Sequence, residues 1–234
     1  ASRGLGDVYK RQPIIVHGGG KRINSKLSEV NIESNFINGL RVTNKETISI
    51  VENVLIEFNK EIVEALNELA CKAKRITSKE NNIITVVQEN KDLGFVGAPT
   101  KINKELLIET IKVNEVPVVA PLGSDKDNQT FNINADTAAG SIAIELKARR
   151  LMIISDVEGV LDSEKKLIPE INSKKANELI DKEVISGGMI PKIKNCLDVA
   201  SNGVKAVVII DGRKNHSLLF ELLSDKGSGT LIRE

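Results

Sequence analysis

A run of three glycines near the start of the sequence has the residue types and the position of an anion-binding loop. A short β-branched segment at Pro13–Val16 is followed by His17 and Gly18–Gly20, and a helical pattern then runs from Lys21 to Val30. Glycines let backbone N–H groups approach an anion, and the helix N-terminus adds partial positive charge. The loop is neither a Walker loop nor a G-x-G-x-x-G motif, so by itself it also fits a plain tight turn. We interpret His17 as a positioning or packed side chain rather than a base.

Two further polar segments precede helical patterns and contain side chains that can bind a carboxylate. Arg41 lies in the segment 38–43 (NGLRVT), and its guanidinium could clamp a carboxylate through charge-assisted hydrogen bonds worth about 1.5–3 kcal/mol. Asn132 and Asn134 lie two residues apart, so in an extended segment they share a face. The alternatives are an ordinary surface arginine at position 41, and an N-cap at Asn134 with Asp136 in the first helical turn.

The second half of the chain contains a lysine placed early in a predicted helix and a tight turn after a buried strand. Lys192 ends the segment 187–192 (GGMIPK), where a cation opposes the helix dipole. A group placed at such a cost is often directed at an anion such as phosphate, although an ordinary exposed lysine would fit too. The segment 155–160 (SDVEGV) is typical of a nucleotide edge in an open α/β sheet, and a simple strand-to-loop exit would look the same.

The hydrophobic pattern predicts one α/β domain with two lobes. The apolar runs at Val118–Val119, Leu151–Ile154 and Val207–Ile210 do not alternate, which indicates strands covered on both faces and hence a mostly parallel sheet between helix layers. The stripe from Thr47 to Leu69 has helical period. Two hairpins are expected: one pairs residues 83–88 with 93–96, and the other turns at residues 125–129. Further helices are predicted at 103–113, 135–146, 174–182, 190–200 and 216–223, with a final strand at 229–232.

The composition excludes several classes of protein. The chain of 234 residues has 33 Lys and Arg against 32 Asp and Glu, which argues against a nucleic-acid or an acidic-membrane partner. Its longest apolar runs are far below the roughly 18 residues of a membrane helix. Cys71 and Cys196 form neither a metal motif nor a disulfide framework, and they fit buried thiols in a cytoplasmic protein.

The motifs occur in an order that identifies a family. The chain carries VHGGG, NGLRVT, LGFVG, PVVAPLG, NINAD, SDVEGVLD, ISGGMIPK, VVIIDGR and GSGTLI. Together they resemble the amino acid kinase family, and within it the kinases of N-acetyl-L-glutamate, from about Pro13 to Ile232. The resemblance implies a three-layer αβα sandwich with a mostly parallel central sheet. It divides the chain into an amino-acid lobe at 13–133 and a nucleotide lobe at 134–234.

The resemblance also implies an activity and a substrate site. The family member would phosphorylate the γ-carboxylate of N-acetyl-L-glutamate with ATP, giving N-acetyl-L-glutamyl 5-phosphate, which is the second step of arginine biosynthesis. By matching position, Gly19 and Gly20 would offer N–H groups near the substrate and the transferred phosphoryl group. Arg41 would hold the α-carboxylate, and Asn132 would also bind the substrate. Because a carboxylate is already a nucleophile, phosphoryl transfer needs positioning and cations more than a strong base.

The same resemblance assigns catalytic and nucleotide-binding residues. Lys192 would neutralise charge that grows on the phosphoryl oxygens and the leaving group, and Asp136 would orient the catalytic lysines. Magnesium is expected to arrive with ATP rather than in a protein cage, with no separate protein metal site. The residues expected to line the nucleotide site are Asp156, Val157, Glu158, Gly159, Val160, Leu161, Val184, Ile185 and Ser186.

The N-terminal residues do not fit the family pattern. Residues 1–12 lack hydrophobic periodicity, and Asp7–Gln12 can be back-translated to a transposon-end adapter sequence, so we interpret 1–12 as a non-native tail. The family begins with a strand and a Gly-rich loop that carries a second catalytic lysine, and this segment is expected to precede Pro13. Losing that lysine would cost about 10²–10³ in rate, by analogy with an oxyanion-hole donor, so the chain as written is predicted to be poorly active.

The C-terminal region resembles the arginine-inhibited branch of the family. His216 and Glu221 are candidate contacts to L-arginine, with an exposed helix face as the alternative. A homodimer is expected, and a hexamer in full-length members of that branch. Three other functions stay open: a kinase of carrier-linked aminoadipate, a glutamate 5-kinase, and a non-catalytic arginine-sensing fragment. A nicotinamide-dependent dehydrogenase is disfavoured because no G-x-G-x-x-G is followed by a suitably placed acid.

Overall fold

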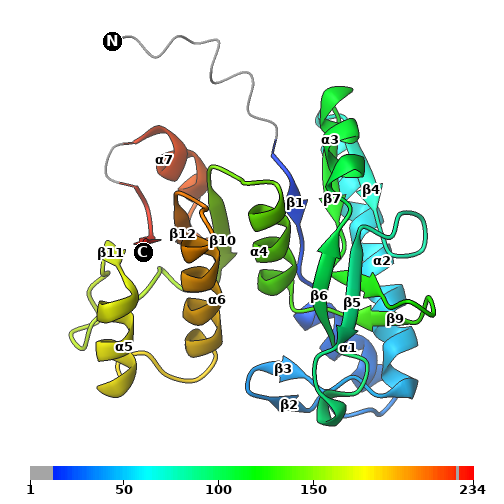
Figure 1. Cartoon of the computed structure of the whole chain (residues 1–234), viewed down its shortest axis with the longest axis horizontal. Coiled ribbons are helices and arrows are strands. Elements are labelled where there is room, and N and C mark those ends of the chain that lie inside the picture. Colours follow the sequence, from blue (N-terminus) through cyan, green and yellow to red (C-terminus); the bar gives the residue numbers. More distant parts are fainter. Residues whose placement is uncertain (1–12, 225–226) are drawn as a thin grey trace. The chain divides into compact units, whose positions relative to one another are not determined.

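The structure is a computed structural model that describes residues 13–224 and 227–234 (Figure 1). The proposed non-native tail at 1–12 lies outside the described residues. The chain divides into two compact units, the first up to Ala138 and the second from Ala139. The division falls within helix α4 (Ala135–Glu145), and each unit is described by itself.

The first unit contains a parallel sheet in the order β1-β7-β4. Its strands are β1 (Ile15–Val16), β7 (Val116–Val119) and β4 (Ala73–Ile76). Val119 of the middle strand aligns with Val16 on one side and with Ile76 on the other. The helices of this unit are α1 (Gly20–Glu29), α2 (Lys45–Glu68) and α3 (Lys104–Lys112). Helices α1 and α2 share a hydrophobic cluster that includes Leu27, Leu55 and Leu122, so the Gly-rich loop before α1 is anchored to a packed core.

A second, mixed sheet in the first unit has the order β6-β5-β8-β9. Its strands are β6 (Gly97–Ile102), β5 (Ile84–Gln88), β8 (Leu122–Ser124) and β9 (Thr130–Asn132). Strands β8 and β9 pair antiparallel, which confirms the hairpin predicted at residues 125–129. A separate two-stranded hairpin joins β2 (Phe36–Ile37) to β3 (Leu40–Arg41).

The antiparallel hairpin predicted from residues 83–88 is present, but its second strand was wrongly placed at 93–96. Strand β5 pairs instead with residues 97–102, and a short 3₁₀ helix occupies Lys91–Leu93. The Asn90 side chain accepts a hydrogen bond from the Asp92 N–H and caps this turn. The Phe95 N–H then donates to the Thr43 carbonyl at 2.6 Å. The polar residues 89–92 therefore start a helical turn rather than a tight reversal, and the return strand begins later.

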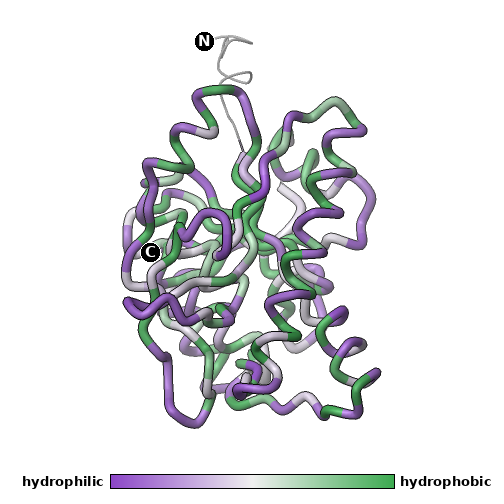
Figure 2. The backbone as a smooth tube through the Cα atoms, turned by 90° about the vertical axis from the view of Figure 1, so that its right-hand side faces the viewer, coloured by the Kyte–Doolittle hydropathy of each residue, from purple (hydrophilic) through white to green (hydrophobic). Residues whose placement is uncertain are grey.

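The second unit contains a sheet in the order β10-β12-β13-β11. The strands are β10 (Leu151–Ser155), β12 (Val207–Asp211), β13 (Thr230–Ile232) and β11 (Glu170–Ile171). Strands β10 and β12 are parallel, whereas β12 and β13 are antiparallel. The helices that begin in this unit are α5 (Ser173–Asp181), α6 (Met189–Ser201) and α7 (Ser217–Leu223). Hydrophobic and hydrophilic residues alternate along the helical segments of the chain (Figure 2).

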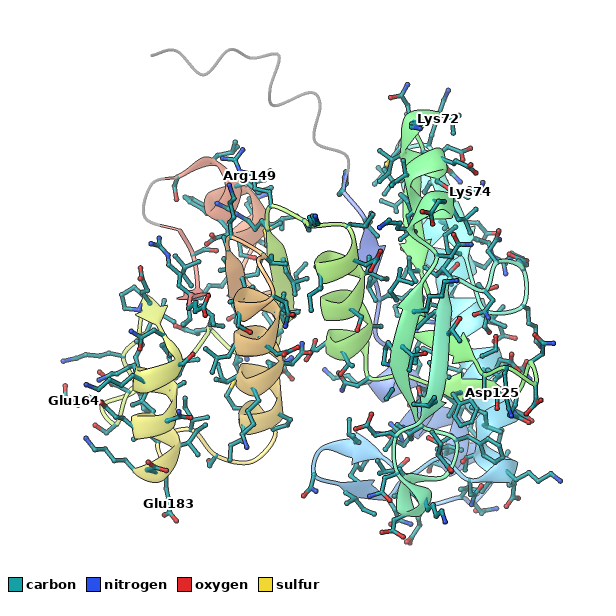
Figure 3. All side chains as sticks on the ribbon, in the orientation of Figure 1. Lys72, Lys74, Asp125, Arg149, Glu164 and Glu183 are labelled. Carbon is teal, nitrogen blue, oxygen red and sulfur yellow. The ribbon has the colours of Figure 1, made fainter. Side chains whose placement is uncertain are left out.

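The α/β fold class is confirmed by parallel strands with helices packed against them, and the antiparallel pairs make two of the sheets mixed. Charged side chains such as Lys72, Glu164 and Glu183 are exposed and project away from the ribbon (Figure 3). In the described parts of the chain, no helix combines the length and the apolar content that crossing a bilayer requires.

The two asparagines that precede α2 and α3 give a matched test of helix capping. Asn44 Oδ1 accepts hydrogen bonds from the N–H groups of Glu46 and Thr47, both at 2.9 Å, whereas Asn103 makes no side-chain cap bond. Asn44→Ala should lower the free energy of unfolding by about 1 kcal/mol, and Asn103→Ala should change it by less than about 0.5 kcal/mol. Urea unfolding followed by circular dichroism measures both values, and equal losses would contradict the assignment.

Candidate active site

A pocket of about 180 Å³ opens in the first unit where six chain segments meet. Four of the residues predicted for substrate binding line it together: Gly19, Gly20, Arg41 and Asn132. The remaining wall includes Ile23, Phe36, Leu40, Leu55, Val96, Pro121 and Ile133. Sequence reasoning did not assign these apolar residues to the site, although three of them lie in the quoted motifs NGLRVT, LGFVG and PVVAPLG. Sequence reasoning misses such residues because an apolar side chain in a motif is usually assigned to the hydrophobic core.

The glycine loop lines this pocket with its backbone packed closely against the core, where a larger residue would not fit at Gly19. Helix α1 begins at Gly20, and its first turn contains no acidic residue. A Cβ on Gly19 would lie 2.6 Å from Leu55 Cδ2, whereas a Cβ on Gly20 would meet nothing within 4 Å. Leu55 is 1% exposed, so a shift of its side chain would disturb the packed core. Gly19 is therefore required by packing, and Gly20 leaves open space where backbone N–H groups at a helix start can meet an anion.

Arg41 is a buried cation whose partners are all uncharged. Its side chain is carried by β3 and donates to Ser34 Oγ at 2.7 Å and to the Gly20 carbonyl at 3.3 Å. The guanidinium also lies 4.7 Å from the centroid of the Phe36 ring. Arg41 is 7% exposed, and burial lowers the pKa of its guanidinium, which nonetheless stays charged. Among the described residues it contacts no carboxylate, so an anion that enters the pocket would supply the missing counter-charge.

The two asparagines before α4 have different roles: Asn132 lines the pocket and Asn134 caps the helix. Asn132 lines the pocket and donates through Nδ2 to Thr43 Oγ1 at 3.4 Å. Asn134 Oδ1 accepts from the N–H groups of Asp136 and Thr137 at 3.0 and 3.1 Å, which confirms the alternative that Asn134 caps the helix. Asp136 lies in the first turn of α4, in the same unit as the pocket.

In the second unit, the turn predicted to bind the nucleotide is fixed by packing. Gly159 has φ +138°, and a Cβ there would lie 2.6 Å from Thr230 Oγ1. The same hydroxyl accepts from the Val160 N–H at 2.8 Å and donates to the Ile168 carbonyl at 2.7 Å. This position therefore demands glycine for both conformation and space.

The predicted nucleotide residues differ in what they can offer a ligand. Val160 and Ile185 are buried in the core cluster of the second unit, and Val184 packs against it. The N–H groups of these three residues are hydrogen-bonded within the unit, whereas the polar side chains of Asp156 and Ser186 are exposed. The Glu158 carboxylate lies 3.2 Å from Lys214 Nζ. Lys192 lies in the first part of α6 in this unit, as predicted for the helix.

The two candidate arginine contacts have different surroundings. His216 is exposed, with φ +61°, and directly precedes α7. Glu221 does not lie on an exposed helix face, because its side chain is 9% exposed and its Oε2 accepts from the Ser228 N–H at 2.8 Å. Its Oε1 also lies 3.5 Å from Arg150 Nη1.

In the described parts of the chain, no group of three His, Cys, Asp or Glu side chains is arranged to hold a metal ion.

Comparison with known proteins places this chain among related kinases. A profile described as the amino acid kinase family matches residues 3–211. The acetylglutamate kinase of Pelagibacter ubique is 92% identical over 222 residues, covering 95% of this chain and 77% of that protein. The acetylglutamate kinase of Ruegeria pomeroyi is 46% identical over 94% of this chain and 77% of that protein. The crystal structure of smu.665 from Streptococcus mutans superposes with a TM-score of 0.85 at 31% identity, covering 100% of this chain and 92% of that one.

The neighbouring glycines of the loop should respond differently to alanine. Gly19→Ala places a methyl group against Leu55 and is expected to lower the free energy of unfolding by about 1–3 kcal/mol through overpacking. Gly20→Ala meets no atom and removes a flexible residue from a helix start, so stability should be unchanged or slightly higher. Denaturant unfolding compares the two variants. Equal destabilisation would mean that the loop is held in a different way.

Proposed function

The chain belongs to the amino acid kinase family, and on that premise we propose that the pocket of the first unit binds the amino-acid substrate. The chain uses ATP to phosphorylate the γ-carboxylate of N-acetyl-L-glutamate, a step of arginine biosynthesis. In the reaction a carboxylate oxygen attacks the γ-phosphorus of ATP. The bond from that phosphorus to the bridging oxygen breaks, and ADP leaves with the electron pair.

The main support for the proposed site is that the Arg41 guanidinium is buried and that its partners are all uncharged. Burying a charge is costly unless it is paired, and removing one member of a buried pair leaves the other uncompensated. A substrate carboxylate would restore the pairing, and the planar fork of arginine suits a carboxylate well. Together with the N–H groups of Gly19 and Gly20, Arg41 makes the pocket selective for an acid.

The apolar wall supports an N-acylated substrate over free glutamate. The pocket lining contains no Asp or Glu, and its one charged residue is Arg41. A free α-ammonium group would find no anionic partner there and would be desolvated at a cost of several kcal/mol. A neutral N-acetyl group carries no such cost, and its methyl fits a wall of Ile23, Leu40 and Val96. This argument disfavours a glutamate 5-kinase, and the relatives named as acetylglutamate kinases favour acetylglutamate over a carrier-linked aminoadipate.

We further propose the remaining parts of the machinery from the family pattern. Lys192 would neutralise charge on the transferred phosphoryl group, and Asp136 would orient the catalytic lysines. The residues 156–161 and 184–186 would line the ATP site, on a backbone that internal hydrogen bonds hold in place at Val160 and Ile185. Magnesium would enter with ATP as part of the substrate.

Regulation by L-arginine and assembly into a homodimer are also proposals. Glu221 already lies 3.5 Å from the Arg150 guanidinium, so its carboxylate is placed to accept from a guanidinium donor. His216, exposed before the same helix, would be the second contact.

The Arg41 site is tested by direct binding, which requires no turnover. Isothermal titration at pH 7.5 should show that Arg41→Lys weakens N-acetyl-L-glutamate binding by about 10- to 100-fold, because a bidentate charged contact is worth about 1.5–3 kcal/mol. Arg22→Lys is the matched control, since Arg22 forms an exposed ion pair with Glu61 at 2.7 Å outside the pocket. L-Glutamate should bind the parent chain at least about tenfold more weakly. Unchanged affinity in Arg41→Lys would overturn the site.

The role of Lys192 is tested with a neighbouring lysine as control. Lys192→Met should lower the rate of acyl-phosphate formation, trapped with hydroxylamine, by about 10²–10³ relative to the parent chain, because the transition state loses a cation. Lys194→Met changes an exposed lysine on the same helix and should leave the rate within about twofold. Equal effects of the two substitutions would refute a specific role for Lys192.

A further inference from the structure

His17 is buried directly behind the glycine loop but does not line the pocket. It is 6% exposed and follows β1, which places the imidazole between the parallel sheet and α2. Its ring makes an edge-to-face contact with Phe58, with 5.2 Å between ring centroids. The second polar residue at this place is Asn59, which is 0% exposed within the apolar face of α2. A buried amide in such a stripe costs stability unless its polar atoms are used.

The hydrogen bonds of this pair define one protonation state of the imidazole. His17 Nδ1 lies 2.8 Å from the Gly18 carbonyl oxygen, which can only accept, so Nδ1 carries the proton. His17 Nε2 lies 3.2 Å from Asn59 Nδ2, which can only donate. The same Nδ2 donates to the Val118 carbonyl at 2.8 Å, so the orientation of the amide is fixed by a strand of the sheet. The chain of bonds runs from β7 through Asn59 and His17 to Gly18.

This chain of bonds orients the next peptide group of the loop. In a trans peptide the carbonyl and the following N–H point in opposite directions. Because His17 holds the Gly18 carbonyl on its own side, the Gly19 N–H points away from His17. Gly19 lines the pocket, and within the described residues its N–H meets no acceptor. The imidazole therefore determines where one N–H group of the anion loop is directed.

We propose that His17 and Asn59 are positioning residues which hold the Gly18–Gly20 loop in its anion-binding geometry, and that they do so only while the imidazole is neutral. The inference rests on the proposed function of the pocket. A protonated Nε2 would face the Nδ2 donor of Asn59, so two donors would oppose each other. Asn59 Oδ1 has no partner among the described residues, but turning the amide to use it would break the bond to Val118.

The surroundings favour the neutral form near pH 7. Burial lowers the pKa of the His17 imidazole, with the Gly18 carbonyl acting in the opposite sense. The charged groups beyond the Phe58 ring are Arg22, whose guanidinium lies 4.0 Å from the ring centroid, and Glu61, which pairs with Arg22. Since these two charges compensate each other, His17 is charged only at low pH. Its protonation would then weaken substrate binding as the pH falls below about 6.5, the ordinary pKa of histidine.

The experiment is a pH titration of N-acetyl-L-glutamate binding between pH 7.5 and 5.5, followed by calorimetry on the full chain. The Kd should rise by at least about twofold by pH 5.5. The rise should stay below about tenfold, because a histidine of ordinary pKa would be about nine-tenths protonated at pH 5.5 and burial lowers the pKa of His17. The ligand carboxylates stay ionised in this range. In His17→Asn the Kd should vary by less than twofold with pH, because asparagine has no charge to gain. His216, the other histidine of the chain, remains in both proteins and serves as an internal control.

Two further measurements separate positioning from folding. A histidine whose pKa is lowered on folding destabilises the folded state as the pH falls, so circular dichroism must show a folded protein at each pH. Nitrogen-15 NMR of the imidazoles in the parent chain should show His17 protonated at Nδ1 at pH 7.5, which needs no variant. A pH-independent Kd or an Nε2-protonated His17 would overturn this inference alone. Failure of the parent chain to bind N-acetyl-L-glutamate at pH 7.5 would overturn both the proposed site and the inference.

Discussion

The first unit is organised around a positive charge that the described protein residues leave without a counter-charge. Arg41 is buried at 7% exposure, and it contacts a hydroxyl, a carbonyl and an aromatic ring rather than a carboxylate. These neutral partners lower the cost of burying a guanidinium without cancelling its charge. In the proposed site, a substrate carboxylate would supply the missing counter-charge. This arrangement suits an enzyme that must bind a doubly charged acid and then place one of its carboxylates against ATP.

The packing of the core makes this arrangement possible. Leu55 fills the space beside Gly19 and so brings the loop backbone directly onto α2. One turn further along the same helix, Asn59 turns toward the sheet and holds His17. The face of α2 that forms the core thus also determines the shape of the loop. Substitutions on this face are expected to affect stability and binding together, which explains why a fully buried asparagine is placed there.

In the second unit, a buried hydroxyl rather than an imidazole fixes the backbone of a loop. Thr230 is 0% exposed, and its Oγ1 joins the Val160 N–H to the Ile168 carbonyl. The turn that follows β10 is therefore tied to the last strand of the sheet. In both units a buried polar residue from a distant segment helps to fix the backbone of a glycine-containing loop: Thr230 does so directly, and Asn59 does so through His17. Backbone groups fixed in this way lose little entropy when a phosphate or carboxylate binds.

Local patterns in the sequence determined a large part of this description. The period of residues 47–69 predicted α2, and the apolar runs predicted β7, β10 and β12. The ordered motifs predicted the family and four of the residues that line the pocket. These features depend on neighbours in the chain, or on motifs long enough to be specific. The partner of β5 was misassigned because Asn90 and Gly94 favour a helical turn whose tie to Thr43 spans distant residues. The pairing of His17 with Asn59, 42 residues apart, could not be predicted from sequence at all. Hydrogen bonds between buried side chains depend on which atoms the fold brings within about 3 Å, and only the tertiary structure decides that.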